Sequence, residues 1–437
     1  MTPVFPPPAA PGPAAASGWR RLHPLTPVLR GGRSLVVLLG VLGSQTLRTG
    51  PSALATVAVL VLGTLLAGVL GALAWQTTRY RVADGELQVD SGVLVRRARR
   101  VPLARVQSVD VVRPLVGRLL GLAELRLEVV GGADTEAPLS YLSEQDAHDL
   151  QAFLLAEGRA PQVGATPPAP EQVLVRVPTG VLIASNLLGA PVVLAAVLVP
   201  VLLVVLLVEP AAALPLLATA GPVLFGVGGL VVRRVLAEYG STVAESPEGL
   251  RLRHGLLETR TQTVPPGRVQ TVRVLEPLLW RRFGWVRVEV DVAGYAGRGE
   301  EQSATSALLP VAPRPLADAL VARVLGAALP PAQVPVPVQA RWRAPLSAHR
   351  LRVGLDDRHL VTTSGVLTTT TDVVPLAKVQ SLRTLQGPWQ RSLGLATVVA
   401  DTAGRRLPGA VARHRDAAEA ARLVAELAAR ARAARHR

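Results

Sequence analysis

The chain has 437 residues, of which 49% are apolar, 18% are charged and only 3% are aromatic, with a formal net charge of +16 and no cysteine. The lack of cysteine excludes disulfides, thiolate metal sites and cysteine nucleophiles. The scarcity of aromatic residues argues against single-strand nucleic-acid binding, whereas a basic chain with long apolar segments suits a membrane that carries anionic headgroups.

The first apolar sequence follows a basic segment at residues 1–33, whose Pro/Ala-rich start predicts disorder and is unlike a signal peptide. Residues 53–75 carry no charge and are long enough to span a hydrocarbon core of about 30 Å. Residues 34–47 offer about 14 residues of helix, which is short of a full span. We expect a transmembrane hairpin over residues 34–75, in which the full crossing by residues 34–47 stays open.

A second apolar pair is more pronounced. Residues 180–208 are uncharged, Glu209 and Pro210 form a turn, and residues 211–232 return. Two adjacent runs of this length predict a second transmembrane hairpin at residues 180–232, and buried helices of a soluble domain are the alternative. Arginines lie before and after each apolar pair, outside the turn that connects its two runs. The positive-inside rule therefore places both termini on the cytoplasmic side of the plasma membrane.

The remaining sequence contains three copies of one pattern. VPLARVQSV at residues 101–109 matches VPPGRVQTV at 264–272 and VPLAKVQSL at 374–382. The constant differences are 163 (265 − 102) and 273 (375 − 102), and the same differences relate three further sets of glycines. These sets are Gly92, Gly255 and Gly365; Gly121, Gly284 and Gly394; and Gly131, Gly294 and Gly404. Landmarks that stay in register without a gap indicate an internal structural repeat.

Each copy begins with β pattern and ends with helix pattern. We expect modules at residues 79–157, 238–326 and 345–437, separated by a Pro/Ala linker at 158–175 and a Pro-rich linker at 327–340. The strands and helices that we expect lie at residues 80–83, 86–90, 93–101, 106–112, 125–130, 114–121 (a short helical turn), 143–155, 316–325 and 417–433. Gly92, Gly255 and Gly365 are predicted at tight turns with positive φ.

Four motifs carry a family resemblance: RLHPL at residues 21–25, GVL at 92–94, VPLARVQ at 101–107 and RLLGL at 118–122. With them, the chain resembles the YdbT/YdbS-like bacterial multi-pass membrane proteins with PH-like domains, over residues 22–427. The resemblance implies an α+β membrane protein with two transmembrane helical hairpins and three PH-like β-sandwich or barrel modules, each closed by a C-terminal helix. The second copy departs most, and its barrel is expected to be irregular.

The sequence predicts no catalytic residue, no cofactor site and no metal site. The histidines are scattered without ligand spacing, and no phosphate loop, HExxH or nucleophile-elbow motif is present. We therefore expect a protein that is not an enzyme. Arg105, Arg268 and Lys378 occupy equivalent positions in the three copies. They are either anion contacts or solvent-facing structural residues, and the repetition favours the structural interpretation.

One cationic cluster distinguishes the first copy. Arg96, Arg97, Arg99 and Arg100 are candidate contacts with an anionic surface, and the aligned positions of the later copies lose most of this charge. A solvated strand is the alternative, and the arginines near the C-terminus compete for the same role. The expected function is a membrane-anchored scaffold whose modules contact partner proteins, each other or lipid headgroups, without nucleic acid. The alternative is an accessory subunit of a transport or envelope-stress system.

Overall fold

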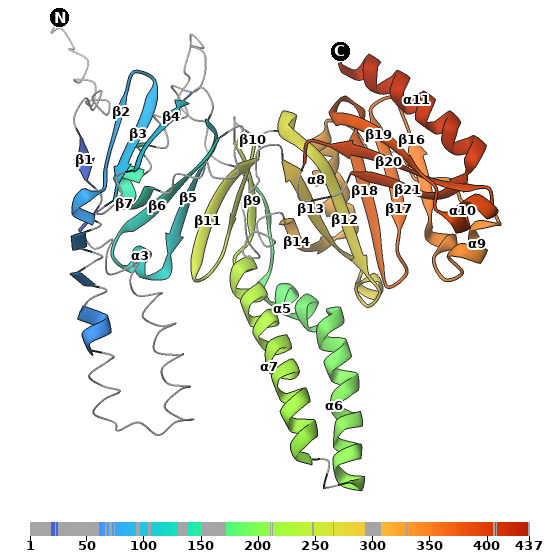
Figure 1. Cartoon of the computed structure of the whole chain (residues 1–437), viewed down its shortest axis with the longest axis horizontal. Helices are drawn as coiled ribbons and strands as arrows, with labels where there is room; N and C mark the ends of the chain where they lie inside the picture. The colour runs from blue at the N-terminus through green and yellow to red at the C-terminus, as the bar shows by residue number, and fades with distance from the viewer. Residues whose placement is uncertain are drawn as a thin grey trace, which may run out of the picture. The chain divides into compact units, whose positions relative to one another are not determined.

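The computed structural model describes residues 19–21, 23–24, 61–65, 68–69, 72–73, 75–92, 97–103, 106–129, 139–147, 149–150, 172–209, 211, 213–246, 249–264, 266–292, 307–328, 331–404, 407 and 409–435 (Figure 1). The chain divides into two compact units. The first consists of Met1–Thr166 and Glu258–Gln262, and the second of Pro167–Leu257 and Thr263–Arg437. We refer to the three sequence copies as repeats 1, 2 and 3.

The first unit contains the strands of repeat 1. One antiparallel sheet has the order β1-β2-β3-β4, formed by Arg20–Arg21, Arg79–Ala83, Glu86–Ser91 and Arg97–Pro102. A second group has the order β7-β6-β5, formed by Leu139–Ser143, Leu122–Val129 and Val106–Pro114, with the short helix α3 at Leu115–Leu119. Ser143 caps the closing helix, because its hydroxyl accepts a hydrogen bond from the Asp146 backbone N–H at 3.0 Å.

The second unit contains most of repeat 2. The strands β8, β9 and β10 pair in sequence and span Gln172–Arg176, Thr242–Ser246 and Gly249–His254. Strands β12 (Val269–Pro277), β13 (Trp285–Val292) and β14 (Ala307–Pro313) form a second group, followed by helix α8 (Arg314–Leu325). Strand β11 (Glu258–Val264) is divided between the two units.

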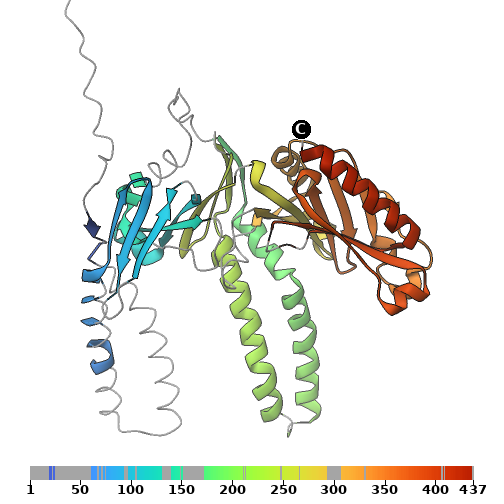
Figure 2. The ribbon, with the colours of Figure 1, turned by 45° about the horizontal axis from the view of Figure 1, so that its top comes forward.

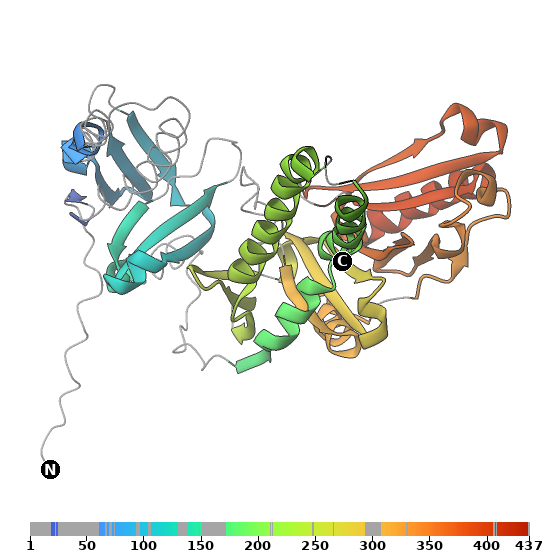
Figure 3. The same ribbon diagram turned by 90° about the horizontal axis from the view of Figure 1, so that it is seen from below.

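Repeat 3 completes the second unit with the same strand order. The strands β15 (Val334–Pro335), β16 (Arg352–Leu355), β17 (His359–Ser364) and β18 (Thr368–Pro375) pair in sequence. The strands β19 (Val379–Leu385), β20 (Leu395–Thr402) and β21 (Ala410–Asp416) form the other sheet. Helix α11 (Ala417–Arg435) packs on this three-stranded sheet, as Figure 3 shows in red. The expected β-rich α+β architecture with a closing helix is confirmed.

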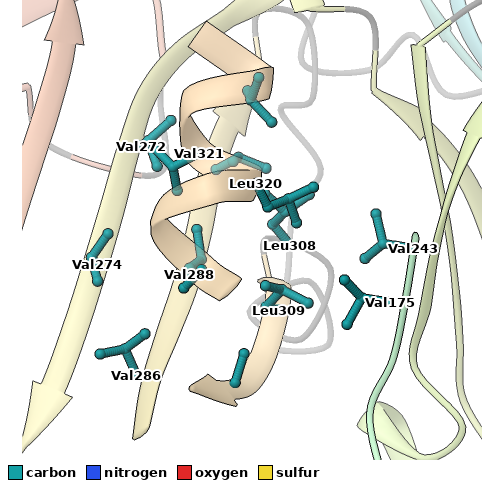
Figure 4. Close-up of a cluster of buried hydrophobic side chains, with 14 of the residues drawn as sticks. Val175, Val243, Val272, Val274, Val286, Val288, Leu308, Leu309, Leu320 and Val321 are labelled. Carbon is teal, nitrogen blue, oxygen red and sulfur yellow. The ribbon is translucent and has the colours of Figure 1, made fainter. Parts of the chain in front are cut away.

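The hydrophobic core of repeat 2 shows why this sequence forms a two-layered structure. Alternate residues of β12 and β13 face inward, among them Val272, Val274, Val286 and Val288, each no more than 2% exposed. Leu320 and Val321 of α8 point toward these strands, and β8 and β9 contribute from the other layer (Figure 4). The inward-facing residues of the strands, spaced two apart, and one face of α8 are therefore buried in the same core.

The structure corrects the predicted linkers, because each repeat begins with a strand that we did not expect. Strand β1 lies within residues 1–33, β8 begins within the Pro/Ala linker predicted at 158–175, and β15 lies within the Pro-rich linker. Each is the outermost strand of its sheet, where proline and short length are tolerated because one side needs no ladder partner. The carbonyl of Val334 in β15 accepts a hydrogen bond from the buried guanidinium of Arg415 at 3.2 Å, which holds the Pro-rich segment in place.

The apolar run at residues 180–208 is divided into two helices. Helix α5 (Thr179–Leu187) is followed by Gly189, whose backbone is extended, and helix α6 (Ala190–Val208) has Pro191 in its first turn. Proline cannot donate to the preceding turn and clashes with it, so the break falls in front of Pro191. Helix α5 packs on repeat 2, where the indole of Trp280 donates to the Ser185 carbonyl at 2.9 Å. Helix α6 lies beside the returning helix α7 (Ala213–Glu238), which α5 also contacts.

The three equivalent glycines have the predicted conformation. The φ angles of Gly92, Gly255 and Gly365 are +118°, +105° and +91°. L-residues rarely adopt these angles, so glycine is required at this turn in every repeat. At Gly365 a Cβ would in addition overlap the carbonyl oxygen of Thr368.

Replacing Gly365 with valine is expected to lower the free energy of unfolding by about 1–3 kcal/mol, the usual cost of such backbone strain. The measurement is thermal unfolding of the full chain in detergent. Gly267→Ala serves as the control, since a Cβ there meets open space, and its change should stay within about 0.5 kcal/mol. An unchanged melting temperature for Gly365→Val would contradict the assignment of strain to this turn.

Candidate docking and membrane surfaces

Helices α6 and α7 are the membrane surface of the second unit. They lie side by side and project away from the sheets (Figure 2). Two segments, Ala190–Val208 and Ala220–Glu238, are long and apolar enough to cross a bilayer, with mean hydropathies of 3.2 and 1.5. No residue of α6 is buried, and Leu207 and Phe225 are more than 80% exposed. A soluble core helix buries its apolar side chains, so this exposure fits lipid as the surrounding medium.

The end of α7 is tied to repeat 2 by buried charges. Glu238, the last residue of α7, receives the Arg287 guanidinium at 2.6 Å, and Glu289 receives the same guanidinium at 2.8 Å. The side chains of Arg287 and Glu238 are only 5% and 3% exposed. Burial alone lowers the pKa of Arg287, but the two carboxylates more than offset this and raise its pKa above the usual value. The helix is therefore fixed to β13 by a hydrogen-bonded ion network in which each charge has an opposite partner.

Repeats 2 and 3 are joined by a continuous sheet. Strand β12 pairs with β18 in antiparallel register, from Val272 opposite Val373 to Pro277 opposite Thr368. Within this ladder Arg273 donates to the Asp372 carboxylate at 2.6 Å. Burial raises the pKa of Asp372 above its ordinary value, while the hydrogen bond from Arg273 lowers it in part. Backbone pairing across the repeats makes this junction part of the fold.

Further groups form hydrogen bonds across the same junction. One guanidinium nitrogen of Arg281 donates to the carbonyl of Val366 at 2.8 Å and to the hydroxyl of Thr369 at 2.6 Å. At the other end, the Leu407 backbone N–H donates to Asp291 of repeat 2 at 3.0 Å. The neighbouring Gly404 has to be glycine because a Cβ would overlap the Asp291 carboxylate. One of the repeated glycine landmarks thus serves close contact between repeats.

The first unit contains an equivalent junction. Its β5 pairs with Glu258–Gln262, and Pro114 lies opposite Glu258 just as Pro277 lies opposite Thr368. The repeat differences relate Pro114 to Pro277 and Glu258 to Thr368, so the two junctions have the same register. The side-chain contact also recurs, because Arg118 donates to the Thr259 hydroxyl at 3.4 Å, as Arg281 does to Thr369.

Strand β19 of repeat 3 is equivalent to the junction strands β5 and β12, and it is the edge strand of its sheet. Among the described residues it pairs with β20 alone. Ser381 and Thr384 are exposed, whereas the equivalent Thr271 and Val274 of β12 are buried. Arg391, the equivalent of Arg118 and Arg281, is exposed, and its side chain has no hydrogen-bond or ion-pair partner in the described part of the chain.

The repeated cations predicted from the motif occupy turns. Arg268 ends the 3-10 turn η3 (Pro266–Arg268) and is exposed, and Lys378 ends η7 (Leu376–Lys378) and is half-buried. Arg105 lies outside the described residues. Gln270 donates to the Arg268 carbonyl at 3.3 Å, which is a local backbone contact.

The cationic cluster of repeat 1 lies on β4, the last strand of its sheet in the described chain. Arg100 is exposed and Arg99 is half-buried. Arg96 lies outside the described residues, as does the side chain of Arg97. By repeat alignment, β4 is the counterpart of β18, so these arginines occupy a strand that forms a junction elsewhere in the chain.

Repeat 3 has a short surface segment where repeat 2 has the apolar helices α6 and α7. Between β15 and β16 lie α9 (Ala340–Arg343) and the 3-10 turn η6 (Ala348–Arg350). Val338, Trp342 and Leu346 are 68%, 78% and 76% exposed in this segment. Trp389 lies near it, with the guanidinium of Arg343 at 5.7 Å from its ring centre. Exposed apolar and aromatic side chains beside arginines suit the interfacial region of a bilayer.

Much of the first predicted hairpin, residues 34–75, lies outside the described residues. Within the described chain, no group of three or more histidines and carboxylates could hold a metal ion. Sequence reasoning missed the junction arginines, Arg118, Arg281 and Arg391. The sequence feature that could have identified them is their equivalent position in the three copies, since the repeat differences relate them directly.

Comparisons with known proteins agree with this architecture. A family profile described as "Bacterial PH domain" matches residues 34–158, 185–329 and 320–431. A curated relative, the UPF0699 transmembrane protein YdbT of Bacillus subtilis (strain 168), is 23% identical over 271 residues, which cover 55% of this chain and 54% of that protein. The chain thus matches about half the length of this relative. The resemblance inferred from the motifs is confirmed. No solved structure gives a significant match.

Proposed function

Because the chain belongs to the bacterial PH domain family and carries two helices able to span a bilayer, we propose that it is a non-catalytic membrane-anchored scaffold. In this proposal three PH-like modules lie on the cytoplasmic side of the plasma membrane. They correspond to repeats 1, 2 and 3, each extended by its leading strand β1, β8 or β15. Their task is to present binding surfaces at a fixed place relative to the membrane.

The observation that carries this proposal is the shared sheet of repeats 2 and 3. Two modules on a flexible linker would move independently, whereas β12 and β18 are paired along six residue positions. The buried ion network of Arg287 and Glu238 connects the same body to α7. A scaffold needs such rigidity, because fixed modules present a surface to a partner without an ordering cost.

The topology follows from the distribution of arginine. Arg20, Arg21 and Arg79 flank the first predicted hairpin, and Arg176 and Arg233 flank the second, all on the side of the repeats. The positive-inside rule then gives four crossings with both termini in the cytoplasm. The arginines of β4 are proposed contacts with anionic headgroups, which attract basic residues by roughly 1 kcal/mol each.

Reporter fusions test this arrangement. A reporter that is active only in the cytoplasm, fused after Arg437 or inserted after Gly158, is expected to be active at both positions. The matched control is an insertion after Glu209, in the turn between α6 and α7, which should be inactive. Activity after Glu209, or inactivity after Gly158, contradicts the proposed topology.

A pull-down separates the scaffold from an accessory subunit of a transport or envelope-stress system. After crosslinking in native membranes, an accessory subunit copurifies in fixed stoichiometry with a channel or an ATPase. A scaffold copurifies with proteins that lack transport machinery. Stoichiometric recovery of a transporter would replace the scaffold proposal with the alternative.

A further inference from the structure

The exposed edge of β19 is built like the two occupied junctions of this chain. We propose that β19 and Arg391 form a docking edge for a strand from a PH-like module of a second protein, which pairs with β19 as β18 pairs with β12. This inference rests on the proposed scaffold function and names the class of partner that the scaffold binds.

The two internal junctions define what such an edge requires. In both, a strand of the following repeat pairs with an equivalent strand in the same register, and an arginine from the next turn reaches a threonine hydroxyl. Repeat 3 retains both requirements, with β19 as the strand and Arg391 as the arginine. What differs is the pairing: among the described residues, β19 is hydrogen-bonded to β20 alone.

The side chains of β19 have the exposure of a strand that lacks its neighbour. Arg273 of β12 is 17% exposed and pairs across the junction with Asp372. Its equivalent Arg383 is 57% exposed and pairs within its own sheet, with Asp401 on β20 at 2.6 Å. Leu385 and Trp389 are also exposed, at 48% and 63%. Edge strands are normally protected by lysine, proline or a bulge that turns the edge away. Strand β19 contains no lysine or proline, and its bulge between Val379 and Ser381 recurs in β5 and β12, where it does not prevent pairing with a further strand.

The charges decide against a second copy of this chain as the partner. Among the three equivalent strands that the structure describes, β11 and β18 already have neighbours on both sides, which leaves β4, the counterpart of β18 in repeat 1. In that register Arg99 would lie opposite Arg383, and Arg96 would replace the threonine that Arg391 requires. The β12–β18 junction places Asp372 and Thr369 at these positions. Like charges across a strand pair are unfavourable, so the fitting partner carries hydroxyl or acidic residues there.

Photo-crosslinking in native membranes tests this inference with the full chain. The photoreactive amino acid p-benzoylphenylalanine is placed at Thr384, which is exposed on β19, and in a control at Ala421 on the exposed face of α11. The expected result is an adduct from Thr384, absent from Ala421, whose peptide maps to a module of a second protein, in the strand equivalent to β18. Arg391→Ala is expected to lower the yield about tenfold, as the loss of a charged hydrogen bond predicts. Arg422→Ala, an exposed arginine of α11, should leave the yield unchanged.

Four outcomes would overturn the inference. They are an adduct only with lipid, an adduct with a second copy of this chain, an adduct outside a PH-like module, and a yield from Thr384 no higher than from Ala421. Melting temperatures of all variants, measured in detergent, show whether each remains folded. The reporter fusions distinguish the two proposals: correct topology without the adduct rejects the docking edge alone, whereas wrong topology rejects the scaffold arrangement.

Discussion

Replacing Glu238 with leucine is expected to lower the free energy of unfolding by about 3–5 kcal/mol, the usual cost of removing one partner of a buried ion pair. Glu238 and Arg287 are both almost fully buried, so the guanidinium would lose its shortest contact and keep only Glu289. The loss should also loosen α7 from β13. Thermal unfolding of the full chain in detergent measures the first effect, and limited proteolysis after Glu238 measures the second.

The double variant Glu238→Leu with Arg287→Met provides the control. Hydrophobic side chains of similar volume often replace a buried pair without loss, so the double variant should recover most of the stability. Glu289 is 17% exposed and can be hydrated after the change. If the double variant is as unstable as the sum of the two single variants, the ion network is not the interaction that joins α7 to repeat 2.

Replacing Asp372 with arginine is expected to separate repeats 2 and 3 at the β12–β18 ladder, at a cost of about 3 kcal/mol. The new arginine would lie opposite Arg273 in a position where Asp372 is only 9% exposed. The value is at the lower end of the range for buried pairs because Arg273 keeps 17% exposure. Hydrogen exchange measured by mass spectrometry should show faster exchange in β12 and β18, while the β20 and β21 amides remain protected.

Charge exchange tests whether the effect is specific to this pair. The double variant Arg273→Asp with Asp372→Arg restores opposite charges across the ladder and should recover protection in β18. Arg383→Asp is the matched control, because this equivalent arginine is exposed on β19 and should leave β12 and β18 unchanged. Equal exchange in wild type and Asp372→Arg would show that backbone pairing alone holds the junction.

Much of the fold could be predicted because the strands repeat. Alternation in residues 106–112 and the Asp84–Gly85 turn give the correct strands, and Gly92, Gly255 and Gly365 have the predicted positive φ. The leading strands could not be predicted. β1 and β15 contain two residues each, too few for any periodicity, and β8 follows a Pro/Ala-rich segment. Their pairing depends on strands that are far away in the sequence, and local propensity carries no such information.

The junctions were beyond sequence reasoning for a related reason. The threonines of β18 look like an ordinary solvated strand, and nothing local shows that Thr369 lies beside Arg281. The division at Gly189 was also hidden, since α5 is as free of charge as α6 and only its contact with Trp280 sets it apart. The cationic cluster of β4 was visible in the sequence, but its position on a junction strand became clear only from the paired strands.

The insertion of α5, α6 and α7 between β8 and β9 has a consequence for biogenesis. These two strands pair with each other and flank the membrane helices, so β8 leaves the ribosome first and has to wait for its neighbour. In the proposed membrane arrangement, α6 and α7 enter the bilayer between the synthesis of β8 and of β9, which couples membrane insertion to the folding of this repeat. A chain that fails to insert leaves Val175 and Val177 without their core, and such exposed apolar strands are what chaperones and quality-control proteases recognise.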